Sequence, residues 1–132
     1  MQWKIIITAV FFIFVFVFGF WLSRSGKPYN MLIFNLHKLI GLAMGVFLIV
    51  TVYQVHKTVA FTPFVISALL VTVLIFLVLV AAGGLLSFEA AGDLQNASQS
   101  LLNGVALAHK VLPYLALLST AGTLYLLLFQ VV

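Results

Sequence analysis

The amino-acid sequence predicts an all-α fold, an integral membrane four-helix bundle, and three observations lead to this prediction. Hydrophobic residues make up 65% of the 132-residue chain and charged residues only 6%, whereas soluble domains carry roughly a quarter of their residues as charges. So few charges cannot cover a water-facing surface. The uncharged sequence also falls into four runs, and each is long enough, or nearly so with its flanks, to supply the about 20 residues that a helix needs to cross the hydrocarbon core.

The first span is placed at about 3–22. One pattern in this span, taken alone, would indicate a strand. Phenylalanine recurs at every second position from 12 to 20, but the residues between are equally apolar. A barrel strand needs a polar face towards the lumen, so a helix is predicted. Trp3 and Trp21 lie 18 residues apart, about 27 Å along a helix, as interfacial aromatic anchors do.

The other spans are placed at about 33–56, 63–86 and 106–130. The link from Lys57 to Pro63 is short, so the second and third spans must be antiparallel neighbours. The interfacial segment 87–105 is the only long polar stretch. Asp93 can cap a short amphipathic helix there, which we expect to lie along the membrane interface over one end of the bundle.

Cysteine is absent, which excludes disulfides, thiolate metal sites and covalently attached c-type haem. The net charge of +4 arises from six basic and two acidic residues, and the basic residues are spread along the chain, so they form no patch for nucleic acid. In a membrane protein such residues mainly set topology. Four of them gather at one end of the bundle, which favours a cytoplasmic location for that end, whereas Lys4 ahead of the first span favours the reverse.

Histidine is the residue type that points to chemistry. The chain has three histidines, and each is followed by lysine. His37 opens the second span and His109 opens the fourth. These two spans run in the same direction, so both imidazoles are expected at one depth. His56 lies 19 residues beyond His37, about 28 Å further along the helix, and cannot join them.

An internal repeat relates the two halves of the chain. An offset of 72 residues pairs His37 with His109, and it also matches one Lys, one Thr and one Tyr in each half. Chance identity is the competing explanation in such apolar sequence. A true repeat would make the bundle two tandem helical hairpins related by an axis along the membrane normal. Paired histidines at that axis suit one planar ligand.

Haem b is the cofactor that these residues predict. Neutral imidazoles of His37 and His109 can fill both axial positions of the iron and make a low-spin electron-transfer centre. Gly41 and Gly45, one and two turns beyond His37, leave room for a flat macrocycle. Pro113, one turn beyond His109, frees a backbone carbonyl and bends the helix.

Anionic haem propionates would lie at the membrane interface, where cationic side chains collect. The candidates are Lys38, Lys110 and Arg24. Each candidate residue also has a plainer interpretation. Gly41-x-x-x-Gly45 is a common helix-packing motif, a histidine at a helix end can simply be solvated by headgroups, and lysines beside spans mark topology.

His56 has its own alternatives. Its plainer interpretation is an interfacial residue. Its functional interpretation is a hydrogen bond to a quinone headgroup, together with Tyr53 or Gln54. The fourth span offers no second histidine at this depth.

The chain resembles the small four-helix membrane cytochromes b, of which cytochrome b561-like proteins are the broad example. The resemblance covers the architecture of the whole chain and rests, residue by residue, on His37 and His109. It implies haem b held between histidines on different helices, and electron exchange with quinones or other redox partners. His56 departs from the two-haem pattern, because Tyr125 and Gln130 occupy the matching depth of the fourth span. One haem at most is therefore implied.

Two other function classes stay open. One is a structural or assembly subunit of a larger membrane complex, without a redox role of its own. The other, a transporter or channel, is the weakest, because the spans lack the charged groups that a transport path needs. Expected partners are the lipid bilayer and either partner subunits or further copies of this chain, with no nucleic acid. The expected location is a prokaryotic cell membrane, crossed several times.

Overall fold

The structure is a computed structural model that describes residues 2–131, and this part of the chain contains four α-helices and no strand. The helices are α1 (Gln2–Ser25), α2 (Met31–His56), α3 (Pro63–Ala91) and α4 (Gln99–Val131). Each is long and apolar enough to cross a membrane. The predicted all-α four-helix fold is confirmed, and the helices are those of a multi-pass membrane protein.

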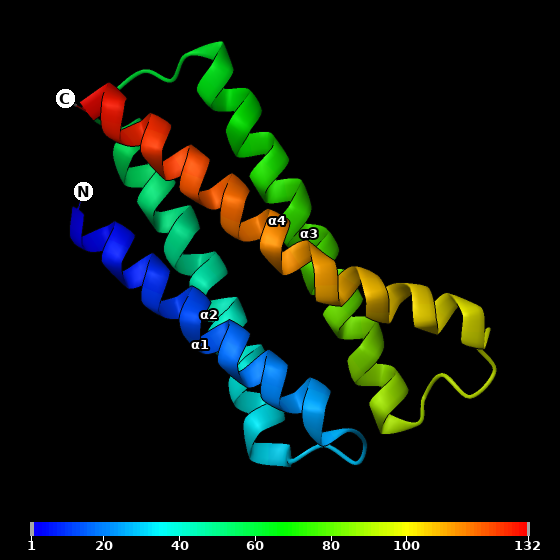
Figure 1. Ribbon diagram of the computed structural model, residues 1–132. Coiled ribbons are helices and arrows are strands. Elements are labelled where there is room, and N and C mark those ends of the chain that lie inside the picture. The colour runs from blue at the N-terminus through cyan, green and yellow to red at the C-terminus, as the bar shows by residue number, and fades with distance from the viewer. Residues whose placement is uncertain (1, 132) are drawn as a thin grey trace.

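The four helices form two hairpins, α1 with α2 and α3 with α4, and α1 also contacts α4 (Figure 1). The two ends of the chain lie at the same end of the molecule as the link 57–62, which joins the hairpins. The opposite end carries the links 26–30 and 92–98, and we call it the loop end. Helices α2 and α4 therefore both run away from the loop end, as the sequence predicts.

Local signals in the sequence fix where helices begin. The side chain of Asn30 accepts hydrogen bonds from the backbone nitrogens of Leu32 and Ile33, at 3.0 and 3.2 Å, and caps α2. Thr62 caps α3 in the same way, and Pro63 stands at the first helical position, where its missing N–H costs nothing.

The segment 87–105 differs from its prediction. Helix α3 continues to Ala91 and α4 already begins at Gln99. Between them, the structure describes no separate helix, so the prediction of a short interfacial helix is wrong. Gly92 takes the left-handed conformation, with φ of 84°, and closes α3. The backbone nitrogen of Asp93 donates to the carbonyl of Phe88 at 3.0 Å. Asp93 therefore belongs to the end of α3 and does not start a new helix.

Two apolar clusters form the core. Near the end that holds both termini, the buried residues are Val55, Val65, Leu124 and Leu127. Towards the loop end, they are Phe12, Met44 and Ala116. Five buried threonines lie between these clusters along the helices: Thr8, Thr51, Thr72, Thr120 and Thr123. Every helix contributes at least one hydroxyl to this layer, in which Thr72 and Thr123 are hydrogen bonded at 3.0 Å.

Removing that interhelical hydrogen bond should weaken the second hairpin. Hydrogen bonds between membrane helices contribute about 0.5–1.5 kcal/mol, so Thr72→Val and Thr123→Val should each lower the free energy of unfolding by this amount. The double variant should lose less than the sum, because one bond is shared. Unfolding in mixed detergent micelles measures these values. The control is Ser67→Ala on the same helix, which removes an exposed hydroxyl whose hydrogen bond, to the carbonyl of Pro63, stays within its own helix. Additive losses would contradict the bond.

Candidate functional site

His37 of α2 and His109 of α4 meet between the two hairpins. Their ring centroids lie 6.3 Å apart, with the ring planes at 81° to each other. Both side chains are half-buried. The structure therefore brings together the two residues that the sequence selects as ligands, and each ring comes from a different hairpin.

Each histidine ring packs against a glycine of the helix that precedes its own. A Cβ atom built on Gly19 of α1 would lie 3.0 Å from Cε1 of His37. A Cβ atom built on Gly83 of α3 would lie 3.0 Å from Cε1 of His109. An alanine at either position would therefore force the histidine ring to shift by a few tenths of an ångström.

The two rings differ in how their Nδ1 atoms are held. Nδ1 of His37 lies 3.1 Å from the backbone carbonyl oxygen of Val15. A carbonyl only accepts, so Nδ1 donates its proton, and Nε2 of the neutral ring keeps a free lone pair. The carbonyl of Leu79 is the corresponding partner of His109, but the contact is looser, because the buried Nδ1 of His109 meets no acceptor in good hydrogen-bond geometry.

These contacts extend the internal repeat to all four helices. An offset of 64 residues relates α1 to α3 and pairs Gly19 with Gly83, as the offset of 72 pairs the histidines. The same offset pairs Val15 with Leu79. Equivalent residues Phe12 and Phe76 also touch, with ring centroids 6.4 Å apart. Two pairs of equivalent residues in mutual contact mark a pseudo-two-fold axis that passes between the hairpins.

The threonine layer follows the same symmetry. Thr8 donates to the carbonyl of Lys4 at 2.8 Å, and Thr72 donates to the equivalent carbonyl of Ala68 at 2.9 Å. Sequence reasoning missed the roles of Gly19 and Gly83, although the offset of 64 could have found them. The signal is hidden because eight more residues separate Gly83 from His109 than separate Gly19 from His37.

The predicted glycines on α2 make no close contact that explains them. A Cβ built on Gly41 or on Gly45 would meet no atom within 4 Å. This glycine pair is therefore not a site of close helix–helix approach in this chain, and the space beside it is free for a flat ligand or for lipid. Pro113 lies within α4, and the backbone bond it cannot donate is the one to the carbonyl of His109.

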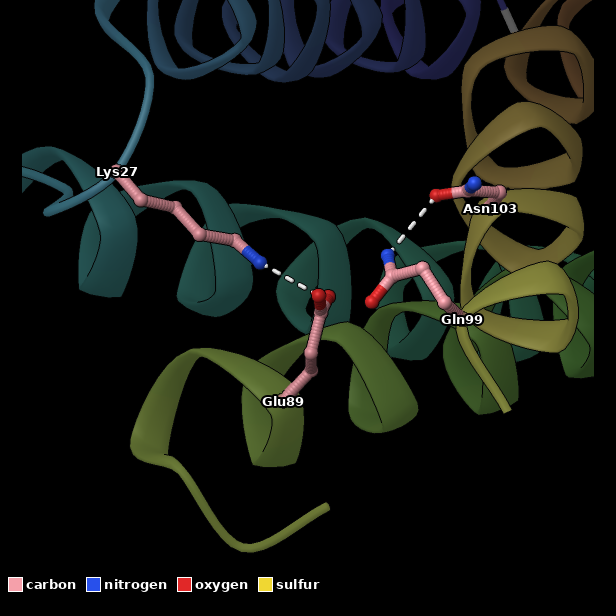
Figure 2. A network of polar contacts seen from close by, with 4 residues as sticks. All are labelled: Lys27, Glu89, Gln99 and Asn103. Carbon is pink, nitrogen blue, oxygen red and sulfur yellow. Dashed lines mark hydrogen bonds and ion pairs between the residues drawn. The ribbon is translucent and has the colours of Figure 1, made fainter. Parts of the chain in front are cut away.

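Polar contacts join the two hairpins at the loop end. Lys27, in the link before α2, forms an ion pair of 2.7 Å with Glu89 of α3, and Lys38 of α2 donates to the hydroxyl of Ser87 at 3.1 Å. Figure 2 shows Lys27 and Glu89 pointing towards each other, beside the start of α4, where Gln99 bonds to Asn103.

Of the other predicted cations, Arg24 lies over the ring of Phe20, with 5.4 Å from Cζ to the ring centroid. Lys110 is exposed and has no hydrogen bond or ion pair within residues 2–131. The loop end thus holds one cation, next to His109, that is not engaged by a protein partner.

His56 lies apart from this site, exposed at the far end of α2, with its ring 5.0 Å from that of Phe61. Gln54 accepts a hydrogen bond from Lys4, and Lys57 lies over the ring of Tyr53 at 4.7 Å. Of the predicted polar helpers of His56, the amide oxygen of Gln54 is therefore already engaged, whereas the contact of Tyr53 involves only its ring.

A bare metal ion does not suit this donor set. No group of three or more histidine or acidic side chains gathers in the described part of the chain, and a structural or catalytic zinc ion takes at least three protein ligands. Two opposed imidazoles suit an iron whose other four positions are filled by a macrocycle. Searches of family models, curated proteins and solved structures found no match to this chain.

Proposed function

We propose that the protein binds one haem b between His37 and His109 and acts as a membrane electron carrier. The observation that carries the proposal is the 6.3 Å separation of the two imidazole centroids. Metal–imidazole bonds are about 2 Å long and a ring nitrogen lies about 1 Å from the ring centre, so two axial imidazoles have centroids roughly 6 Å apart.

The hydrogen bond from His37 to Val15 supports the same role. Histidines that bind metals commonly donate their other ring N–H to a carbonyl, which fixes the tautomer and the direction of the ring. The bond of 3.1 Å leaves Nε2 of His37 unprotonated, which is the state that an iron ligand requires. Gly19 and Gly83 then allow each ring to lie against its neighbouring helix without a steric conflict.

The surroundings of the histidine pair suit a large apolar ring with an anionic edge. Gly41 and Gly45 are half-buried, and a Cβ added at either would meet no atom within 4 Å, so the space beside them is open. Lys110, one residue after His109, is a cation available to a propionate group. Haem would supply one-electron redox chemistry when bound; the chain would supply the two imidazole nitrogens and the orientation of the His37 ring.

The test is the visible spectrum of the protein purified in mild detergent from haem-replete cells. We expect one haem b per chain by pyridine haemochrome assay, with a low-spin spectrum whose Soret and α bands sharpen on reduction. A quinol should reduce it if quinones are the electron partners. A colourless preparation that also fails to take up added haemin would contradict the proposal and favour a structural subunit of a larger membrane complex.

A further inference from the structure

An apolar groove with a cation at its rim lies on α1, close to the loop end. Its lining residues are Val17, Phe20, Trp21, Arg24 and Ser25. The first four are spaced i, i+3, i+4 and i+7, so they lie on one side of the helix. The residues that α1 buries in the bundle lie on the opposite side. The groove therefore faces the bilayer.

The cation of this groove, Arg24, is exposed and has no acidic partner. The chain has only two acidic residues, and the one ion pair within residues 2–131 joins Glu89 to Lys27. The guanidinium of Arg24 lies over the ring of Phe20, a contact that leaves its N–H groups without an acceptor. Ser25 already donates its hydroxyl proton to the carbonyl of Trp21, at 2.9 Å. The guanidinium is therefore the group at this rim that is free to bind an anion.

The second hairpin does not repeat the groove. The offset of 64 residues that relates α1 to α3 places Gly84 at the position of Phe20. It places Phe88 at the position of Arg24. Helix α3 forms the equivalent hairpin with neither the aromatic ring nor the cation, so the hairpin fold does not require them. The groove is therefore a feature of α1 alone.

We propose that this groove binds one anionic phospholipid of the bilayer, whose phosphate lies on Arg24 and whose acyl chain lies along Val17 and Trp21. Trp21 belongs at the level of the membrane interface, as aromatic anchors do, and Arg24 follows it by one turn, at the depth of the phosphate groups. A guanidinium donates charge-assisted hydrogen bonds to phosphate, and each cation near the surface attracts anionic lipid. Lipid binding at this groove does not require a bound haem.

The experiment uses Trp21 as the reporter, because bromine atoms on an acyl chain quench the fluorescence of an indole that they touch. Trp3→Phe leaves Trp21 as the one tryptophan of the chain and keeps an aromatic ring beside Phe47. This protein is reconstituted in phosphatidylcholine bilayers with rising fractions of brominated phosphatidylglycerol or brominated phosphatidylcholine. Half-maximal quenching should need an about fivefold smaller fraction of the anionic lipid, the effect of one cation near the surface.

Three further variants, each made in the Trp3→Phe protein, assign this preference to one side chain. Arg24→Gln should make the two brominated lipids quench equally. Arg24→Lys keeps the positive charge and should keep most of the preference. Lys110→Gln is the matched control, because it removes another exposed cation of the loop end, on α4, and it should leave the fivefold preference unchanged.

Three results would overturn the proposal. The first is equal quenching of the Trp3→Phe protein by the two lipids. The second is the same loss of preference in Lys110→Gln as in Arg24→Gln, because the attraction would then come from the general charge of the loop end. The third is a preference that inorganic phosphate abolishes at constant ionic strength, which would assign the groove to a free anion instead of a lipid.

Discussion

Replacing either His37 or His109 by alanine should abolish the low-spin haem spectrum, the largest effect expected from any single substitution in this chain. A six-coordinate low-spin iron needs both axial nitrogens, and the two ring centroids lie 6.3 Å apart, with the third histidine at the far end of α2. The visible spectrum of each purified variant measures the loss. His56→Ala is the matched control, since His56 is exposed at the opposite end of α2.

Added imidazole separates a lost ligand from a damaged fold. In His109→Ala, free imidazole can enter the vacated position and should restore the low-spin bands, whereas it cannot repair a misfolded bundle. An unchanged spectrum in either alanine variant would contradict the assigned ligand pair, and so would an equal loss in His56→Ala.

Substituting the two glycines behind the rings should weaken haem binding strongly, although neither glycine is a ligand. In Gly83→Ala the new Cβ would lie 3.0 Å from Cε1 of His109, and in Gly19→Ala it would lie 3.0 Å from Cε1 of His37. The ring must move, and changes to groups that orient a metal ligand typically cost 10- to 100-fold in affinity. Haem titration of the apoprotein, followed at the Soret band, measures the change.

Gly84→Ala provides the control for this prediction, because a Cβ at Gly84 meets no atom within 4 Å. Alanine in place of glycine inside a helix stabilises by about 0.5–1 kcal/mol, so Gly84→Ala should raise the free energy of unfolding and leave haem affinity unchanged. Equal haem affinity in Gly83→Ala and Gly84→Ala would show that the close contact does not position His109.

The sequence predicts the spanning helices of this fold better than it predicts where they end. Four charge-free runs predict four spanning helices, because no other arrangement satisfies the backbone inside lipid apart from a closed barrel. The ends are harder to predict. Helix α4 starts at Gln99, seven residues before the predicted span, since a helix can continue into the interface beyond the hydrocarbon core, where polar residues such as Asn103 are tolerated.

The candidate site, too, is predictable from the sequence only in part. His37 and His109 are visible because imidazole is rare in apolar sequence and the two residues share an offset of 72. Gly19 is not visible, because its role depends on how α1 packs against α2, and a glycine in a membrane helix has many common reasons to be there. The carbonyl of Val15 carries no side-chain signal at all, so only the fold reveals it.

The most direct measurement of the proposed iron site is the electron paramagnetic resonance spectrum of the oxidised, haem-loaded protein. The two imidazole planes lie at 81° to each other, and near-perpendicular axial imidazoles give a highly anisotropic low-spin ferric signal. We expect this signal in the wild type and in His56→Ala, and its disappearance in His37→Ala and His109→Ala. A high-spin ferric signal in the wild type, or no haem signal, would contradict an iron held between His37 and His109.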